Sequence, residues 1–495
     1  TAYLRPGVFV EETLNPLPPA LGSNATSVAA FIGAIDRGPS EVTAVTSWSQ
    51  FTNLYGNYGT LNSVHIAVLL FFSNGGGTCY VRRTLGSGAA IATRSFNDRA
   101  ETPASTLRLN AANPGTWGND LNVTIQNSVS GTGVDVIVFQ GGTSTSNIVE
   151  KFTDLTMGAN DARYLVGVIN GQSKYLTAND LGSEATGSSR LPVTATNQYL
   201  ASGADGSAVT ASTIASDISA FDVVHNSLLI NAPGVTDSTA VGQLLNYAET
   251  RGDAFVIIDP VSGNVASQLS TADSYSPSSY GAVYYPRIVI KDPTSTVSGV
   301  TTSANPGGAI AGVFASTDAS RGVFKAPAGL GARIAGAVSV PTLTNTELDS
   351  MNSNGAAVNA LRYITGSGIV VMGSRTLKPT FVDKYVPVRR TLIYLRKSMT
   401  ELTQFAVFEP NDEKLWRRIN AALDGFLRDF WRQGGLRGTA PAQAFFIKCD
   451  ADNNPQGSID NGYVNIEVGV ALQRPAEFVV IKISQFDGGT TVTVA

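Results

Sequence analysis

Patterns typical of buried strands alternate with helical patterns in two separated stretches of this chain. The run SVAAFIGAI, which starts at Ser27, is almost continuously apolar, and the runs SLLINAP from Ser227 and AFVIIDP from Ala254 are similar. A helical pattern, VGQLLNYAETR, lies between the last two runs. Strand–helix–strand order with apolar strands is typical of a parallel sheet with helices on its faces. We therefore predict an α/β core to which both stretches contribute.

The sequence between these two stretches has a different texture. Short strand patterns such as TLRLNA, LNVTIQ and VDVIVFQ are separated by clusters of Gly, Asn and Ser. This spacing favours a β-sandwich or a barrel, and we expect it to form an inserted domain.

The last part of the chain predicts a compact α+β unit, in which a long helix precedes a closing pair of strands, EFVVIKISQ and TTVTV. A chain of 495 residues is long enough for about three domains. We expect six segments: a terminal arm and linker (1–22), the first part of the core (23–94), the inserted domain (95–195), the second part of the core (196–375), a C-terminal domain (376–475) and a C-terminal strand or arm (476–495).

The low content of charged residues indicates a covered surface. Only 15% of the residues are charged, compared with about 25% in ordinary soluble domains. Such a surface is expected to be covered by a membrane or by protein subunits. The longest apolar run, HIAVLLFF from His65 to Phe72, is far shorter than the roughly 18 residues of a spanning helix. We therefore expect protein partners and no membrane insertion.

The start of the chain and its overall charge indicate where the protein assembles and which partners it lacks. The opening TAYLRPGVFVEE lacks the features of a secretory signal, so we expect assembly in the cytoplasm. The formal net charge is −4, and the strongly basic character that marks nucleic-acid binding is absent. No direct contact with nucleic acid is expected.

The residues that usually carry catalysis are scarce. The chain has two histidines, His65 and His225, and neither belongs to a recognisable catalytic motif. Its two cysteines, Cys79 and Cys449, lie in strand-like runs and predict buried free thiols. No nucleotide-binding loop or metal-binding spacing occurs. We predict no catalytic residue, cofactor or metal site, and no enzymatic activity.

Three local features have both a functional and an ordinary interpretation. Asp259 ends a buried strand, where α/β enzymes place a nucleophile or a metal ligand, but an Asp before a Pro also forms turns. The tripeptide Arg251-Gly252-Asp253 matches an adhesion motif, but its glycine also suits the end of a helix. The glycines from Gly75 to Gly77 could hold a phosphate, but no lysine follows them. We favour the structural interpretation in each case.

The helix expected from Asn411 to Gln433 carries the clearest surface signal. Asn411 is its expected N-cap, and Gly434 follows its end. At about 100° per residue, one face is apolar and the opposite face carries a cationic stripe with two small residues between the charges. The stripe is a solvated face or a docking surface for an acidic partner. The apolar face contains Leu415, Ile419, Leu423, Phe426 and Phe430, and the cationic stripe, with Ala421 and Gly425 between its charges, contains Lys414, Arg418, Arg428 and Arg432.

Both ends of the chain are strand-forming. Strands at chain ends fray unless they pair, either within the subunit or with the sheet of a neighbour. The residues that we expect in such strand arms are Val8, Phe9, Val10 and Glu11 at the start, and Phe478, Val480, Ile481, Ile483, Val492 and Val494 at the end.

Motifs along the whole chain resemble the contractile tail sheath proteins of bacteriophages and related injection machines. The resemblance is densest in the second half. It is carried by LRPGVFVEE, TSVAAFIGAIDRGP, PGTWGNDLNVTI, AVYYPRIVIKDP, GGAIAGVFASTDASRGVFKAPAG, GSGIVVMGSRTL, YVPVRRTLIYLRKSM, FEPNDEKLWRRI, FLRDFWRQGGLRGTAPAQAFFIKCD and RPAEFVVIKI, in this order.

This resemblance implies a structural and mechanical function. Sheath subunits form stacked hexameric rings around a tail tube, between a baseplate and a terminator protein, and lend terminal strands to a neighbour's C-terminal domain. That domain lies innermost, which would place the cationic stripe at the tube. The resemblance also implies a subtilisin-like fold for the second part of the core, although the sequence carries no recognisable protease triad, and an outward-facing inserted domain.

The expected mechanism is contraction of a metastable lattice, which drives the tube through the target cell envelope for genome delivery in a virion. The alternative is the sheath of a non-viral injection particle.

Overall fold

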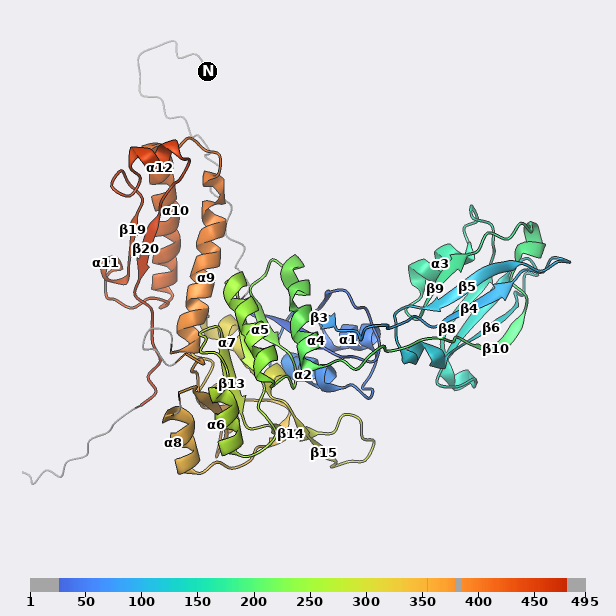
Figure 1. Cartoon of the computed structure of the whole chain (residues 1–495), viewed down its shortest axis with the longest axis horizontal. Coiled ribbons are helices and arrows are strands. Elements are labelled where there is room, and N and C mark those ends of the chain that lie inside the picture. Colours follow the sequence, from blue (N-terminus) through green and yellow to red (C-terminus); the bar gives the residue numbers. More distant parts are fainter. Residues whose placement is uncertain (1–25, 354, 379–383, 479–495) are drawn as a thin grey trace, which may run out of the picture.

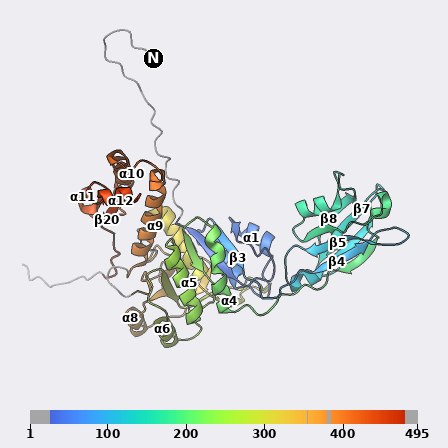
Figure 2. The ribbon, with the colours of Figure 1, turned by 45° about the horizontal axis from the view of Figure 1, so that its top comes forward.

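The computed structural model describes residues 26–353, 355–378 and 384–478. An α/β core lies in the middle of the molecule, with a β-rich body on one side and a helical body on the other (Figure 1). Figure 2 shows the same separation from a second direction. The chain is therefore a mixed α/β multidomain protein, as its sequence predicts.

The core is built on an eight-stranded sheet in the order β18-β17-β13-β12-β11-β1-β3-β2. The six inner strands are parallel, and β2 and β18 pair antiparallel at the two edges. The inner strands read as apolar runs because helices cover both faces of the sheet. Their bounds are β1 Val28–Gly33, β2 Thr43–Val45, β3 Cys79–Arg83, β11 Leu228–Asn231, β12 Ala254–Ile258, β13 Gly281–Tyr285, β17 Val358–Ile364 and β18 Gly368–Val371.

The helices divide between the two faces, and each face has its own hydrophobic cluster. One cluster contains side chains of α1 (Trp48–Tyr55), α2 (Ser63–Ser73) and α7 (Gly307–Arg321). The other contains side chains of α4 (Ala211–Ser216), α5 (Ser238–Arg251), α6 (Val265–Asp273) and α8 (Asn345–Ser353). A small antiparallel sheet joins β14 (Ile288–Lys291) to β15 (Thr301–Ala304) and β16 (Ala337–Ser339).

One helix of the core begins earlier than its sequence pattern suggests. The pattern SDISAFDVV predicts a helix from Ser216, but α4 ends at that residue and a 3-10 helix follows over Asp217–Val223. Thr210 caps α4 because its hydroxyl accepts a hydrogen bond from the N–H of Thr213.

The β-rich body consists of two antiparallel sheets around one hydrophobic core. The described strands do not close into a barrel, so the barrel alternative is wrong. One sheet has the order β4-β5-β9 and the other β10-β6-β7-β8. The bounds are β4 Thr93–Asn97, β5 Ser105–Ala111, β6 Leu121–Asn127, β7 Val134–Gln140, β8 Ile148–Leu155, α3 Leu165–Gln172, β9 Leu176–Asp180 and β10 Ala195–Tyr199.

A buried arginine fixes this body to the core. Arg83 ends β3 and is 2% exposed. Its guanidinium donates hydrogen bonds of 2.7 to 3.0 Å to the carbonyls of Ile35, Asp36 and Gly38 in the core and of Pro114 in the β-rich body. Burial lowers its pKa to about 10. The four carbonyls satisfy the buried donors and hold the two bodies in one orientation.

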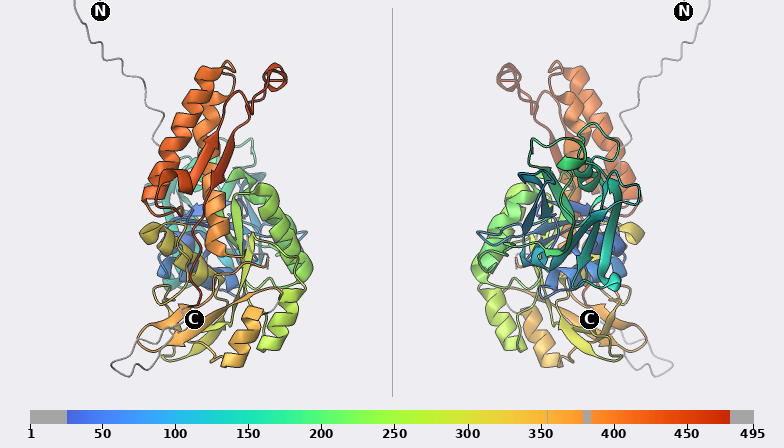
Figure 3. Two further views of the ribbon diagram at one scale, coloured as in Figure 1. Left: turned by 90° about the vertical axis from the view of Figure 1, so that its left-hand side faces the viewer. Right: turned by 90° about the vertical axis from the view of Figure 1, so that its right-hand side faces the viewer.

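The helical body contains two long helices and a two-stranded sheet and rises from the core (Figure 3). Its elements are α9 Val386–Thr403, α10 Glu413–Arg432, α11 Pro441–Ala444, β19 Phe445–Lys448, α12 Gln456–Asp460 and β20 Glu467–Val470. None of the helices in the described part of the chain has the length and apolar character needed to cross a membrane.

Candidate interaction site on the helical body

Helix α10 places its apolar side chains against the rest of the helical body. Leu415, Ile419, Leu423 and Phe430 are buried as predicted, whereas Phe426 is half-buried. The buried face also includes Trp416 and Leu427, two residues that were not predicted on it.

The N-cap of α10 is Asp412, not Asn411, because the carboxylate of Asp412 accepts a hydrogen bond of 2.9 Å from the N–H of Leu415. Asn411 instead accepts a hydrogen bond of 2.8 Å from the indole of Trp416 and donates one to the carbonyl of Tyr463. Asn and Asp are both good N-caps. Because Asn411 is bound to the indole of Trp416, Asp412 takes the capping position.

The four residues of the cationic stripe are exposed, but their surroundings differ. Arg428 forms an ion pair of 2.5 Å with Asp424, and Arg432 forms one of 3.3 Å with Asp429. The guanidinium of Arg418 lies 4.7 Å from the ring centre of Phe405. Among the described residues, no acidic side chain forms an ion pair with Lys414 or Arg418. The unpaired positive charge is therefore concentrated in the first half of the helix.

A groove of about 550 Å³ lies between α10 and the sheet. Ala421, Asp424 and Arg428 line its helix side, and Phe445, Phe446 and Ile447 line its strand side. Gly425 lies on the same helix, and a Cβ built there would meet no atom within 4 Å. The small residues predicted to allow close approach thus lie on an open surface.

The sheet beside this groove has only two strands in the described part of the chain. β19 pairs antiparallel with β20 alone, and Phe445 lies opposite Val470. Phe445 and Ile447 face the helices, whereas the ring of Phe446 is exposed. A two-stranded sheet is only marginally stable unless helices or further strands support it. Because each strand has a neighbouring strand on one side only, its other edge is free to pair with a further strand.

An apolar tip that the sequence patterns did not predict lies where α9 turns into α10. Val407, Phe408 and Tyr463 are exposed there, and Phe408 is 103% exposed. Phe408 also has φ of 66°, in the left-handed region that bulky side chains rarely adopt. Phe408 lies two residues before Pro410 and four before Asp412, the N-cap of α10. A proline close to a helix start indicates a turn, and this signal could have placed Phe408 in an exposed loop.

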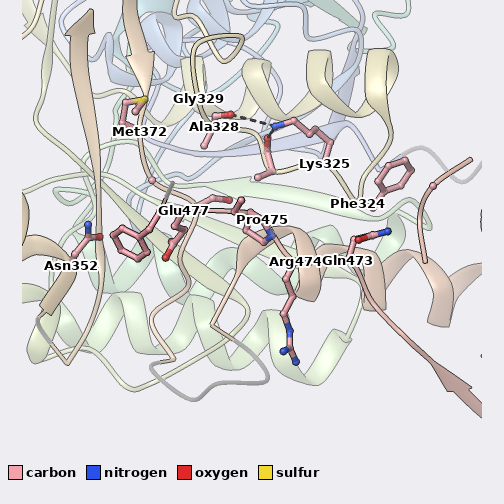
Figure 4. A pocket seen from close by; sticks show the side chains of 16 residues that line it. Phe324, Lys325, Ala328, Gly329, Asn352, Met372, Gln473, Arg474, Pro475 and Glu477 are labelled. Atoms are coloured by element: carbon pink, nitrogen blue, oxygen red, sulfur yellow. Dashed lines mark hydrogen bonds between the residues drawn. The ribbon is translucent and has the colours of Figure 1, made fainter. Parts of the chain in front are cut away.

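The proposed terminal arms lie almost entirely outside the described residues. This applies to Val8, Phe9, Val10, Glu11, Val480, Ile481, Ile483, Val492 and Val494. Phe478 is described, and its side chain is 73% exposed at a pocket of about 500 Å³. Residues 473–478 line this pocket on one side, and the core residues Lys325, Ala328 and Met372 line it on another (Figure 4).

The other candidates have structural surroundings. Asp259 is 1% exposed, and its carboxylate accepts hydrogen bonds from the N–H groups of Gly234 and Gly307 and from the amide of Asn231. It thereby ties the end of β12 to the first turn of α7. Burial raises its pKa, against the effect of these hydrogen bonds. These contacts agree with the structural interpretation.

The adhesion-like tripeptide is held in an internal network. Asp253 forms ion pairs of 2.6 Å with both Arg251 and Lys397, and Gly252 caps α5 in the left-handed conformation. Its charged ends are thus already engaged within the chain.

The predicted positions of the thiols are confirmed, because Cys79 and Cys449 are both buried and free. Across the described ranges, no three His, Cys, Asp or Glu side chains are grouped so that they could hold a metal ion.

Residues 383–486 match the family model described as phage tail sheath C-terminal domain. This segment contains the groove, the sheet and the cationic stripe. A tail sheath protein of Vibrio phage KVP40 is 26% identical over 179 residues, which cover 35% of this chain and 25% of the relative. The resemblance to contractile tail sheath proteins is confirmed. The matched region spans about a quarter of that relative's length.

Solved sheath structures have the same fold over nearly the whole chain. The sheath of an extracellular contractile injection system, PVC, in its contracted state is 23% identical, with a TM-score of 0.59, and the match covers 98% of this chain and 99% of the other. The contracted helical sheath of the anti-feeding prophage (AFP) is 24% identical, with a TM-score of 0.60 and coverage of 97% and 99%. A sheath tail protein of Desulfitobacterium hafniense is 14% identical, with a TM-score of 0.60 and coverage of 90% and 94%.

Proposed function

We propose that this chain is the subunit of a contractile sheath, which polymerises as stacked hexameric rings around a tail tube. The observation that carries the proposal is the two-stranded sheet of the helical body, whose strands have free edges among the described residues. Strand addition from neighbouring copies would complete this sheet through main-chain hydrogen bonds. The strand-forming ends of the chain, including Phe478, are the strands that we propose to add.

The cationic stripe of α10 is the surface that we propose to face the tube. Lys414 and Arg418 are exposed and free of ion pairs to acidic side chains among the described residues, so they are available to carboxylates of a partner. Arg428 and Arg432 would have to exchange their partners on the helix for partners on the tube. Exposed ion pairs contribute little each, about 0 to 1 kcal/mol, so such a contact would hold the extended state and still permit release.

Contraction of the assembled lattice would drive the tube through the target cell envelope, as the proposed role in genome delivery requires. Baseplate and tail terminator proteins would lie at the two ends of the sheath. The subunit would assemble in the host cytoplasm and become part of a virion tail. The six-segment division, the subtilisin-like character of the core and the absence of an enzymatic activity belong to the same proposal.

A second candidate is the sheath of a non-viral contractile injection system. The PVC and AFP sheaths match this chain over 97–98% of its length and 99% of theirs, whereas the phage relative is matched over a quarter of its length. The structural likeness to injection-system sheaths thus extends over nearly the whole length of both chains. A capsid gene beside the coding sequence would favour the virion, and its absence would favour the injection particle.

Negative-stain electron microscopy of the purified chain, expressed without a tube, tests the proposal. Hollow striated cylinders are expected, because a sheath that assembles without a tube reaches its contracted form. Discrete monodisperse particles at all concentrations would overturn it.

A further inference from the structure

The described C-terminal end of the chain is held on the core by an ion pair. Arg375 binds the carboxylate of Glu477 through two nitrogens, with distances of 2.8 Å from Nε and 2.6 Å from Nη2. The hydroxyl of Tyr385 donates a further hydrogen bond to Glu477. Burial acts to raise the pKa of Glu477, but the hydrogen bonds and charge of Arg375 outweigh it, so the pKa lies below its ordinary value. The site around Glu477 therefore stabilises the ionised form of its carboxylate.

The position of Arg375 is itself fixed. Its third guanidinium nitrogen donates to the carbonyl of Asn352 at 2.8 Å. Its backbone N–H and carbonyl both bind the side-chain amide of Asn359 on β17, at 2.7 and 2.8 Å. The side chain of Arg375 is 8% exposed. Glu477 therefore meets a preorganised partner on the core and not a mobile surface arginine.

The first described residue at the other end of the chain is held in a similar way. Arg390 and Asp318 form a buried ion pair, with side chains 3% and 5% exposed. The hydroxyl of Thr26 donates a hydrogen bond of 2.6 Å to Asp318, and its carbonyl accepts one of 3.0 Å from Arg390. The guanidinium of Arg390 also lies 4.8 Å from the ring centre of Phe314 on α7.

Both anchors belong to the part of the chain that joins the core to the helical body. Arg375 pairs with Tyr385 in an isolated antiparallel bridge, and Tyr385 is the N-cap of α9. Arg390 lies on α9 five residues after Tyr385, which corresponds to about 7.5 Å along the helix. The two ends of the described chain are therefore tied to one short region.

We propose that Arg375 and Arg390 are the positioning residues of the two terminal arms. This inference rests on the proposed function, because it assumes that residues beyond Thr26 and Glu477 join neighbouring subunits. Arg375 and Arg390 fix the points from which the arms leave and so set their working length. Force on either arm is delivered to the junction between core and helical body.

The length argument is clearest at the C-terminal end. The segment before Glu477 has further contacts, since the side-chain amide of Gln473 donates a hydrogen bond of 3.2 Å to the carbonyl of Leu436 and the charge of Arg474 acts on Tyr385. If Glu477 were released, residues 475–477 would join the arm, and an extended chain adds about 3.4 Å per residue. An arm longer by about 10 Å would lower the effective concentration of its strand at the neighbour's sheet.

The test compares Glu477→Gln with a matched control, Asp180→Asn. Both substitutions remove one carboxylate charge from a pair with arginine, and the two carboxylate side chains are similarly exposed, at 19% and 18%. Asp180 ends β9 in the β-rich body, whereas Glu477 is held on the core. Amide hydrogen exchange is measured on the unassembled chain, and the concentration needed to form cylinders is measured by sedimentation.

For Glu477→Gln we expect exchange over residues 473–477 to be about tenfold faster, with the core unchanged, and the assembly concentration to rise about fivefold. Asp180→Asn should change neither. Unchanged exchange at 473–477, or assembly equal to that of the control, would overturn the inference. If the unmodified chain forms no cylinders, the proposed function fails, but the exchange measurement still decides whether Arg375 holds this segment.

Thr26→Val provides an independent variant at the other anchor. It removes the hydrogen bond to Asp318 while keeping the shape of the side chain. We expect a rise of about twofold in the assembly concentration, because the hydrogen bond from Arg390 to the carbonyl remains. An unchanged assembly concentration would exclude Arg390 and Asp318 from the proposal.

Discussion

The ring of Phe446 on β19 occupies the space above Gly469, which lies directly opposite it on β20. A Cβ at position 469 would overlap the ring. An aromatic ring that covers a glycine on the neighbouring strand stabilises a pair of strands otherwise weakened by that glycine. This pairing holds the exposed face of the two-stranded sheet in one arrangement.

Gly469→Ala should therefore push the Phe446 ring off the sheet. We expect a loss of about 1 kcal/mol in the unfolding free energy of the helical body, because the exposed ring can move, and a clear loss of assembly. Denaturant unfolding and sedimentation measure the two effects. Gly457→Ala is the control, since a Cβ there meets no atom within 4 Å. Equal assembly of the two variants would argue against a role for this face.

The two halves of the cationic stripe should contribute unequally to tube binding. Neutralising the unpaired residues, as Lys414→Gln with Arg418→Gln, should weaken binding about tenfold at low salt. Neutralising Arg428 and Arg432 should weaken it by about threefold, because Asp424 and Asp429 already engage them. Cosedimentation with tubes at two salt concentrations measures both, and the difference should shrink at high salt. Equal losses, or losses independent of salt, would contradict the assignment.

The exposed tip at Phe408 should matter for association and not for folding. Phe408→Gly removes a bulky side chain from a backbone with φ of 66°. We expect the unfolding free energy to stay equal or rise by about 0.5 to 1 kcal/mol. Assembly or tube binding should weaken about fivefold, because a fully exposed apolar side chain gains most when a partner covers it. Asn also tolerates a positive φ, so Phe408→Asn should have the same effects on unfolding and on association. Unchanged association in both variants would show that the tip has no partner.

His65 should make the core sensitive to acid. Its side chain is 1% exposed, and burial lowers its pKa from 6.5. As the pH falls below 6.5, the unfolded chain binds a proton that the folded chain does not, so stability is lost on the acid side. The loss can reach about 1.4 kcal/mol per pH unit. We expect His65→Leu to show a smaller fall in unfolding free energy between about pH 7.5 and 5.5, measured by urea denaturation. A fall as large as that of the unmodified chain would exclude His65 as the cause.

The segments that could be predicted from the sequence are those whose burial repeats locally. β1, β11 and β12 are buried at every position and almost wholly apolar because helices cover both faces of the sheet, and α10 shows its buried face through a period of about 3.6 residues. The start of α4 was misplaced because the 3-10 helix that follows it carries the same apolar pattern. Patterns of burial do not distinguish the two kinds of helix at a junction.

The chemistry of the candidate site was predicted only in outline. The stripe follows from helical geometry, but the pairing of Arg428 with Asp424 and of Arg432 with Asp429 depends on side-chain rotamers. The exposed Phe408 was missed because an aromatic residue in a motif suggests burial. The anchors at Arg375 and Arg390 join residues far apart in the chain, and nothing in the spacing of those residues indicates their partners.

The α/β character of the core, the separate β-rich insertion, the amphipathic helix and the resemblance to sheath proteins all follow from the amino-acid sequence. Local periodicity and motif order carry that information. The strand order follows from the folded structure alone, in which β1 lies between β3 and β11 although the whole inserted domain separates β3 from β11 in the chain. The same is true of the contacts that hold Thr26 and Glu477 beside α9. Contacts between distant residues depend on how the whole chain packs, and they leave no local pattern in the sequence.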